Sequence, residues 1–284
     1  MENIIKKAGV LVEAVPYIHQ FRKKVFVIKY GGSVLHDDAI RRSVLEDIVF
    51  LSFVGIRIIL IHGGGPHISN RLKAIGVEPE FHNGIRVTDE KTLKIVIEEL
   101  DDINEQIVTE LRSLKGDVTG LKGDENIVYV EKKQAERDLG FVGTITNIER
   151  RIIEKHLRQG HITVIAPMGM SLDKQTHNVN ADEVASAVAA SMCAEKFVLL
   201  TNVPGVMRDP KDKSTLYSTL TLDEVKRLKG EGIIAGGMIP KVDSCIEAVL
   251  GGIPKAHIID ARLDHALLLE IFTDTGVGTQ IVQK

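Results

Sequence analysis

Two lysines in this sequence stand beside glycine pairs, a combination that can hold and neutralise an anionic group. Lys29 lies in the run VFVIKY at 25–30, which two glycines follow directly, and Lys241 comes after the glycine pair at 236–237. Glycine turns let backbone N–H groups approach an anion because no Cβ intervenes. For each lysine the alternative is a solvated surface side chain, whose charge costs little in water.

A cation in the first turn of a helix is electrostatically misplaced, and Lys241 holds that position in the helix predicted at 238–250. The helix dipole disfavours a positive charge there by up to about 1 kcal/mol. An anion bound to the same N–H groups would reverse the sign of that effect. The sequence therefore indicates a bound phosphate as the alternative to a solvated lysine.

A third glycine turn and an acidic segment add to the set. Residues 62–66 read HGGGP, with the proline well placed at the start of a helix. Residues 178–182 read NVNAD, and in an extended segment Asn178, Asn180 and Asp182 would face one side. Asn180 could instead cap the following helix, with Glu183 completing a capping box. Because capping leaves Asn178 unexplained, we expect a functional role for this segment.

These residues, together with the lack of an evident nucleophile, favour phosphoryl transfer. In that reaction the protein mainly positions the reactants and neutralises charge. The sequence has no GxxxxGK[ST] P-loop, no HRD or DFG set of protein kinases, and no GxGxxG after a strand. HGGG also matches an oxyanion motif of esterases, but the GxSxG nucleophile motif is absent, which argues against a hydrolase.

The segments that must position these residues alternate between helix and strand. A β-branched and aromatic run such as 25–30 suits a strand buried on both faces, and a right-handed crossover to the next strand brings the first two glycine turns to one edge. Residues 81–89 are predicted to be irregular, and Thr88 or Asp89 can cap the helix after them. Helices are predicted at 37–54, 66–72, 90–114, 149–157, 182–193, 222–228, 238–250 and 266–272, and strands at 25–30, 57–61, 118–121, 127–130, 141–145, 161–166, 196–200, 256–259 and 280–282.

Repeated βα units of this kind predict an α/β fold with a central, mostly parallel sheet covered by helices. Within it, the short strands between 118 and 145 could form a two-stranded hairpin. The polar, glycine-containing stretch at 167–177 is the candidate boundary between two βα-rich halves of the chain. A helical segment at 4–21 precedes the first strand, and Pro16 predicts that it is kinked or broken. Its apolar stripe could pack on its own subunit or contact another.

Composition excludes several classes of protein. The net charge is −3, with 36 basic and 39 acidic residues spread along the chain, so no basic stripe indicates nucleic-acid binding. No apolar run is long enough to span a membrane, and the N-terminus lacks the pattern of a signal peptide. The two cysteines, Cys193 and Cys245, are both predicted to be buried free thiols in helices, which fits a reducing compartment such as the cytoplasm or an organelle matrix.

Six motifs in order resemble the amino acid kinase family over nearly the whole chain. They are KYGGS at 29–33, HGGGP at 62–66, NGIRVTD at 83–89, NVNAD at 178–182, LLTNVPGV at 199–206 and GGMIPK at 236–241. The resemblance implies a three-layer αβα sandwich. It also implies ATP-dependent phosphorylation of the side-chain carboxylate of N-acetyl-L-glutamate, an early step of arginine biosynthesis, with Mg²⁺ bridging the nucleotide phosphates and no metal ligand assigned to the protein.

The resemblance also assigns roles by motif. Lys29 and Lys241 would neutralise the transferred phosphoryl group and Asp182 would hold both ammonium groups. Amides of Gly32, Gly63 and Gly64 would cradle the phosphate. Arg86, whose fork suits a carboxylate, would bind the substrate α-carboxylate. Gly64, Gly65, Asn178 and Asn180 would assist it. The nucleotide would contact Thr201, Val203, Gly205, Gly236, Gly237 and Met238, although Asn202 stands where relatives commonly have Asp.

A helix ahead of the first strand resembles that of the arginine-inhibited members of the family. Those members are hexamers built as trimers of dimers, so the resemblance implies the same assembly here. The matching effector pocket would comprise Tyr17, Lys196, His257, Glu270 and Gly276, unless Tyr17 and His257 are ordinary partly buried residues. The resemblance divides the chain into an oligomerisation helix at 1–24, a substrate lobe at 25–177 and a nucleotide lobe at 178–284. It leaves regulation by a PII signalling protein open.

Two alternatives remain at this level. Sibling kinases of the family act on glutamate, aspartate, carbamate or UMP, but NGIRVTD and NVNAD favour the acetylated substrate, and the chain is too short for an appended ACT or PUA-like domain. A non-catalytic arginine sensor on the same fold is the other alternative. The joint presence of Lys29, Asp182 and Lys241 argues against it.

Overall fold

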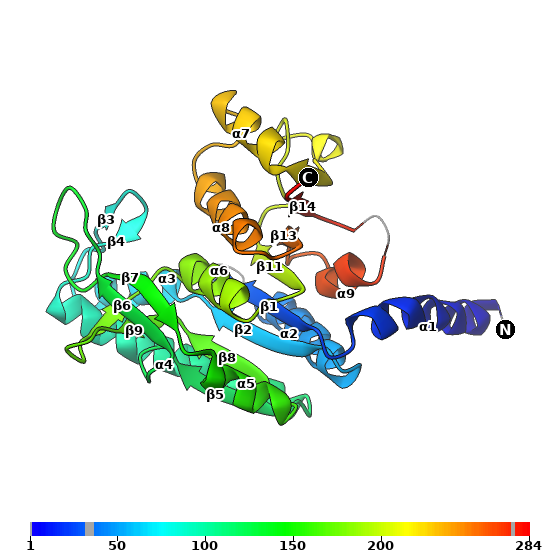
Figure 1. The fold of residues 1–284 in the computed structure, drawn as a ribbon, viewed down its shortest axis with the longest axis horizontal. Coiled ribbons are helices and arrows are strands. Elements are labelled where there is room, and N and C mark those ends of the chain that lie inside the picture. The colour runs from blue at the N-terminus through cyan, green and yellow to red at the C-terminus, as the bar shows by residue number, and fades with distance from the viewer. Residues whose placement is uncertain (1, 32–36, 274–275) are drawn as a thin grey trace.

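The computed structural model describes residues 2–31, 37–273 and 276–284, and Gly32 of the predicted phosphate cradle lies outside them. Its main sheet has the order β12-β14-β13-β11-β1-β2-β8-β5, and neighbouring strands are parallel except at β13 and β14 (Figure 1). The strands are β1 (Val25–Tyr30), β2 (Arg57–His62), β5 (Val118–Lys122), β8 (Ile162–Ala166), β11 (Lys196–Thr201), β12 (Thr219–Thr221), β13 (Lys255–Asp260) and β14 (Thr279–Val282). The predicted mostly parallel sheet is confirmed.

Helices cover both faces of this sheet because successive side chains of a buried strand point to opposite sides. Val27 of β1 packs in a core with helices α5, α6, α7 and α8, whereas its neighbours Phe26 and Ile28 pack with α2, α4 and α9. The helices are α2 (Asp38–Phe53), α3 (Gly65–Ala74), α4 (Glu90–Ser113), α5 (Arg150–Arg158), α6 (Ala181–Ser191), α7 (Leu222–Gly230), α8 (Met238–Leu250) and α9 (Ala266–Ile271), with a short 3₁₀ turn at Lys213–Thr215. The predicted three-layer sandwich is confirmed.

A smaller sheet lies beside the main sheet, at the left of Figure 1. Its order is β10-β9-β6-β7, from β6 (Val128–Lys132), β7 (Gly143–Ile148), β9 (Met168–Met170) and β10 (Thr176–Asn178). The predicted hairpin is present as the antiparallel β6–β7 pair, but β9 and β10 extend it. The stretch at 167–177 therefore forms a hairpin. A second hairpin, β3 (Phe81–His82) and β4 (Ile85–Arg86), occupies the segment predicted as irregular.

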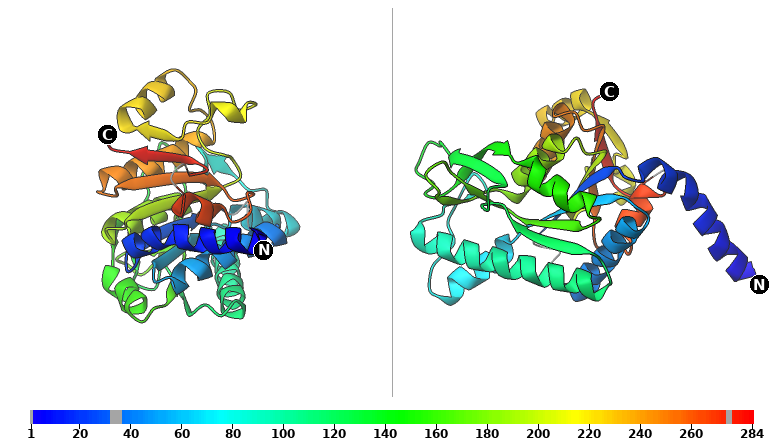
Figure 2. Two further views of the ribbon diagram at one scale, coloured as in Figure 1. Left: turned by 90° about the vertical axis from the view of Figure 1, so that its right-hand side faces the viewer. Right: turned by 60° about the horizontal axis from the view of Figure 1, so that its bottom comes forward.

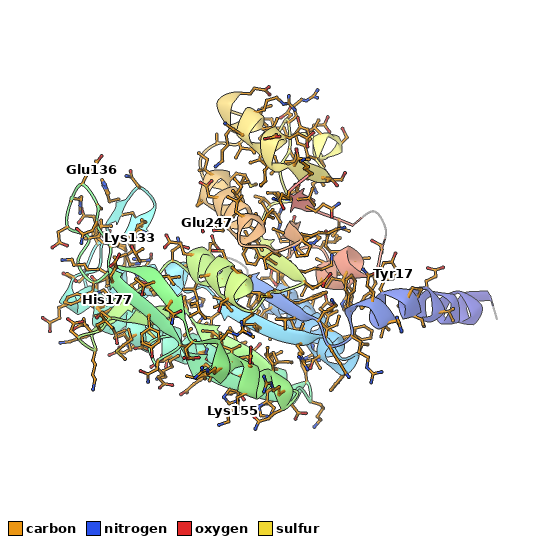
Figure 3. All side chains as sticks on the ribbon, viewed as in Figure 1. Tyr17, Lys133, Glu136, Lys155, His177 and Glu247 are labelled. Atoms are coloured by element: carbon orange, nitrogen blue, oxygen red, sulfur yellow. The ribbon has the colours of Figure 1, made fainter. Side chains whose placement is uncertain are left out.

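The N-terminal helix α1 (Glu2–Phe21) runs without a break through Pro16, so of the two predicted alternatives, a kinked or a broken helix, the break does not occur. It projects from the body in Figure 1 and in the right-hand view of Figure 2, where its path bends. Its last turns pack on the chain: Phe21 stacks edge-on against Phe26 at 5.3 Å between ring centroids, and Tyr17 lies near α9 (Figure 3). Val12 and Val15 are 69% and 56% exposed.

The two cysteines differ in their surroundings. Cys245 is buried in α8 as predicted, but Cys193 is exposed and lies beyond the last residue of α6 in a left-handed turn with φ 48°. Its predicted burial was wrong because the helix ends two residues earlier. Among the described residues, no helix combines the length and apolar character needed to cross a bilayer.

Candidate active site

Lys29 lies near the carboxyl end of β1, which pairs with β2 on one side and β11 on the other. The two halves of the sheet extend in opposite directions from this strand, so it marks a topological switch point. Open α/β sheets bind ligands at this point. The Lys29 Nζ atom is 2.8 Å from Asp182 Oδ1, and both side chains are more than four-fifths buried. Two cavities, of about 270 Å³ and about 70 Å³, are both lined by this ion pair. The pair therefore borders both cavities.

Lys241, on α8, also lines the smaller cavity. Burial lowers the pKa of its ammonium group, the Asp182 carboxylate opposes that shift, and the Lys29 charge adds to it. Two ammonium groups thus share one carboxylate, which leaves a net charge of +1 on these three side chains. Such a site favours an anionic ligand.

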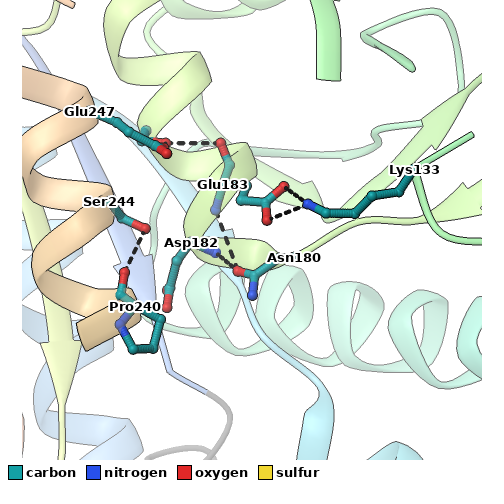
Figure 4. Close-up of polar contacts among 8 residues, drawn as sticks. Lys133, Asn180, Asp182, Glu183, Pro240, Ser244 and Glu247 are labelled. Atoms are coloured by element: carbon teal, nitrogen blue, oxygen red, sulfur yellow. Dashed lines mark hydrogen bonds and ion pairs between the residues drawn. The ribbon is translucent and has the colours of Figure 1, made fainter. Parts of the chain in front are cut away.

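The first turn of α6 presents Asp182, and three contacts hold that turn (Figure 4). Asn180 Oδ1 accepts from the N–H groups of Asp182 at 2.7 Å and Glu183 at 3.4 Å, so its predicted capping role is confirmed. Rather than reaching back to the cap, the Glu183 carboxylate accepts from Lys133 Nζ at 2.9 and 3.2 Å. Farther along α6, the Ser186 hydroxyl donates to Glu247 of α8 at 3.2 Å. These contacts tie α6 to the small sheet and to the helix that carries Lys241.

Arg86 is 6% exposed beside the larger cavity. Its Nη2 donates to Gly65 O at 2.9 Å and to Ser69 Oγ at 2.8 Å, and its guanidinium lies 4.7 Å from the ring centroid of Phe81. Burial lowers its pKa, and its Nη1 is a buried donor with no partner in the described part of the chain. A buried, unpaired N–H of a guanidinium fits a ligand carboxylate. Sequence analysis did not identify Ser69, which lies on α3.

The Asn178 and glycine-turn residues surround the same cavity. Asn178 Nδ2 donates to the Thr88 hydroxyl at 3.2 Å, which in turn donates to Arg86 O at 3.0 Å, so the amide supports the arginine indirectly. Gly64 and Gly65 line the cavity at the N-terminus of α3. The Gly63 N–H donates to Tyr30 O at 2.9 Å. A phosphate contact by that N–H would require this bond to open or to be shared.

The predicted nucleotide residues lie at the carboxyl end of β11 and the start of α8. Thr201 and Asn202 line the smaller cavity, and Thr201 Oγ1 accepts from the Val203 N–H at 3.1 Å. Gly205 has φ 146°, and a Cβ there would lie 2.4 Å from the hydroxyl of Thr279, which makes glycine structurally necessary. Gly236 adopts φ 53° and Gly237 is the N-cap of α8, whose first residue is Met238.

The predicted effector residues form a second, separate cluster between β11, β13 and α9. His257 Nδ1 is 2.6 Å from Glu270 Oε1, and its Nε2 is 3.2 Å from Lys196 Nζ. Burial lowers the pKa of Lys196 to about 8. Burial also acts to raise the pKa of Glu270, but the His257 contact and two backbone N–H donors outweigh it, so the net pKa is lowered.

Glu270 Oε2 accepts those two bonds, from the N–H groups of Val277 at 2.7 Å and Gly278 at 3.1 Å, neither of which sequence analysis identified. Gly276 adjoins the carboxylate, because a Cβ there would lie 2.8 Å from Oε2. Tyr17 packs on Phe272, at 6.3 Å between ring centroids.

Comparisons with known proteins agree with this geometry. The model of the Amino acid kinase family matches residues 24–260. The chain is similar to proteins named acetylglutamate kinase from Desulforamulus reducens (42% identity over 99% of both chains), Syntrophomonas wolfei (46%, 99% of both) and Caldanaerobacter subterraneus (48%, 98% of this chain and 93% of the relative).

Solved structures give the same answer at the level of the fold. N-acetylglutamate synthase from Neisseria gonorrhoeae, in complex with coenzyme A and L-arginine, aligns with a TM-score of 0.85 at 27% identity. The alignment covers 98% of this chain and 65% of the synthase chain. Carbamate kinase from Giardia lamblia aligns with a TM-score of 0.66 at 16% identity over 92% of this chain and 98% of its own. The chain therefore belongs to the amino acid kinase family and is a kinase of that family.

Proposed function

We propose that the chain transfers the γ-phosphoryl group of ATP to the side-chain carboxylate of N-acetyl-L-glutamate, in arginine biosynthesis. The observation that carries this proposal is the larger cavity, which is lined by Arg86 and by the Lys29–Asp182 pair. The unpaired Nη1 of Arg86 suits the α-carboxylate of an amino acid, while the lysine suits the anionic group that reacts. Relatives at 42–48% identity, named acetylglutamate kinase, support the choice of substrate.

The chemistry explains why the site needs no general base. A glutamate side-chain carboxylate has an ordinary pKa near 4.3 and is already ionised at neutral pH. One of its oxygens attacks the γ-phosphorus, the bond from that phosphorus to the β-bridging oxygen breaks, and ADP leaves with the electron pair. Lys29 and Lys241 neutralise the charge that spreads over the transferred group. Asp182 is paired with Lys29 and serves to orient it rather than to accept a proton.

The nucleotide enters as its magnesium complex. In this proposal the ion bridges the phosphates of the nucleotide, as the family resemblance implies. We place the nucleotide over residues 178–284, beside Thr201, Val203, Gly205, Gly236, Gly237 and Met238, and N-acetyl-L-glutamate within 25–177. The smaller cavity, which Lys241, Thr201 and Asn202 line, supports this division.

Feedback inhibition by arginine and assembly into a hexamer are further parts of the proposal. The buried Lys196–His257–Glu270 cluster offers a carboxylate to a guanidinium, and the 27%-identical Neisseria synthase was solved with L-arginine. The projecting α1 leaves Val12 and Val15 exposed, as expected of a helix that packs on another subunit. Arginine would then act by shifting the relative placement of the two lobes through α1.

A coupled assay of ADP release tests the substrate. Purified protein is supplied with MgATP and, in separate reactions, N-acetyl-L-glutamate, glutamate or aspartate. We expect turnover with the acetylated substrate and a kcat/KM at least about 100-fold lower with the other two, because a site built around the acetyl amide leaves polar groups unpaired without it. Preference for glutamate or aspartate would favour a sibling kinase. Absence of turnover with all three, alongside arginine binding, would favour the arginine sensor.

A further inference from the structure

The histidine of the HGGG turn has no part in the function described so far, although it directly precedes the glycines of the cavity. His62 is the last residue of β2 and is fully buried. Its Nδ1 is 3.2 Å from Gly63 O, and its Nε2 is 3.3 Å from Asn104 Nδ2 of α4. Burial lowers its pKa to about 4, so the ring is neutral near pH 7 and carries a single N–H.

The neighbours of the ring decide which nitrogen carries that hydrogen. Gly63 O can only accept a hydrogen bond, so Nδ1 must donate to it. Asn104 Nδ2 also lies 3.4 Å from the carbonyl oxygens of Leu121 and Val164, two acceptors that identify this atom as the amide nitrogen. It is therefore a donor, and the Nε2 atom that it faces must accept. Both contacts require the Nδ1–H tautomer.

A hydrogen bond on one end of a peptide group orients the other end. All described peptide bonds are trans, so the C=O of Gly63 and the N–H of Gly64 point in opposite directions. With Gly63 O held toward the buried ring, the Gly64 N–H is directed away from the core. Gly64 lines the larger cavity together with Lys29, and its N–H has no hydrogen-bond partner within the described ranges.

We propose that His62 is a positioning residue, an inference that rests on the proposed function. Asn104 selects the Nδ1–H tautomer of His62, and the hydrogen bond from Nδ1–H to Gly63 O directs the Gly64 N–H at the transferred phosphoryl group. Asn104 acts one step farther away, from the middle of α4. A fixed donor of this kind stabilises developing charge without reorganising during the reaction. Gly120 makes room for the asparagine, because a Cβ there would lie 2.4 Å from Asn104 Oδ1.

The alternative is a histidine that only fills the core. Two substitutions separate these roles, because the amide nitrogen of Asn overlays Nδ1 of histidine whereas the amide of Gln overlays Nε2. His62→Asn keeps a donor for Gly63 O. His62→Gln keeps a partner for Asn104 but loses that donor. Both place an uncharged polar side chain at the same buried position.

Steady-state kinetics of the full chain with MgATP and N-acetyl-L-glutamate form the first test. We expect His62→Asn to retain kcat within about threefold, and His62→Gln to lose about 10- to 100-fold in kcat with KM changed less than about threefold. Thermal unfolding is measured in parallel. Equal kcat values for the two variants, or kcat losses that follow the loss of melting temperature, would overturn the positioning role.

The tautomer itself is the second test, and it needs no activity. With ¹⁵N-labelled histidine, the His62 signals are assigned by their disappearance in either variant. We expect a protonated Nδ1 and an unprotonated Nε2 from pH 6 to 9, and an Nε2–H tautomer would overturn the proposal whatever the kinetics of the two variants. Wild-type protein that releases no ADP with N-acetyl-L-glutamate would overturn the proposed function. An active wild type with the wrong tautomer overturns only the role of His62.

Discussion

Lys29 and Lys241 present two ammonium groups to one carboxylate, and each is expected to stabilise the transition state more than the ground state. Replacing either lysine with alanine should lower kcat about 10²- to 10³-fold, the usual effect of losing one preorganised donor. Coupled ADP release measures the change, with circular dichroism to verify folding. Lys24→Ala is the matched control, since that side chain is 52% exposed and pairs with Glu195 at 3.0 Å, away from both cavities. Wild-type kcat in both active-site variants would refute the assigned roles.

Arg86 should act mainly on substrate binding. Arg86→Lys keeps the positive charge but loses the two-pronged guanidinium and its contact with Phe81. Hydrogen bonds to charged groups contribute about 1.5–3 kcal/mol, so KM for N-acetyl-L-glutamate should rise about 10- to 100-fold with little change in kcat. Arg71→Lys, on the exposed face of α3 beside Glu98 and Glu99, is the control. A fall in kcat at unchanged KM would contradict this role.

At the scale of elements, a buried carboxylate joins α2 to α9, the helix that carries Glu270. Asp47 of α2 is 1% exposed, and its Oδ1 is 2.6 Å from Nδ1 of His265, the N-cap residue of α9. Burial raises the pKa of Asp47 to about 6, although the His265 contact opposes the shift. The pKa of His265 is raised, chiefly by its hydrogen bond to Asp47.

Both shifts make stability fall as pH rises. Between about pH 4 and 6 the folded state holds a proton on Asp47 that the unfolded state releases. The contribution of this proton to the free energy of unfolding is therefore lost as pH rises through that range. The stabilisation from protonated His265 is fully present below about pH 6.5 and is lost as pH rises through its raised folded value. Urea unfolding at pH 5, 6, 7 and 8 should therefore give a free-energy difference, wild type minus Asp47→Asn, that decreases with pH. A constant or increasing difference would contradict the coupling, and His265→Gln isolates the histidine part.

For the whole molecule, α1 is the helix that extends away from the body of the chain (Figure 1 and the right-hand view of Figure 2). Deleting residues 1–20 removes the exposed Val12 and Val15 together with the Tyr17–Phe272 contact, but leaves both active-site cavities intact. We expect a smaller oligomer by light scattering and a loss of arginine inhibition, with kcat in the absence of arginine within about threefold of wild type. Unchanged oligomer size and unchanged arginine sensitivity would rule out this role for α1.

Much of the architecture follows from local pattern. The run at 25–30, the glycine turn at 63–65 and the helix at 238–250 lie where the sequence predicts them, because strand burial, turn geometry and helix periodicity depend on neighbouring residues. The three-residue strands β9 and β10 escaped prediction since so short a segment has no measurable period. The exposure of Cys193 depends on a helix end that the sequence marks only weakly.

The sequence alone determined which groups are available for chemistry: the two lysines, Asp182, Arg86 and the glycine turns. Only the tertiary structure decided which of their atoms are free to act. Gly63 N–H is bound by Tyr30 O, Arg86 Nη1 remains unpaired, and Asn104 meets His62 from 42 positions away. Such pairings depend on how strands and helices pack, because hydrogen bonds between distant segments have no periodic signal in the chain.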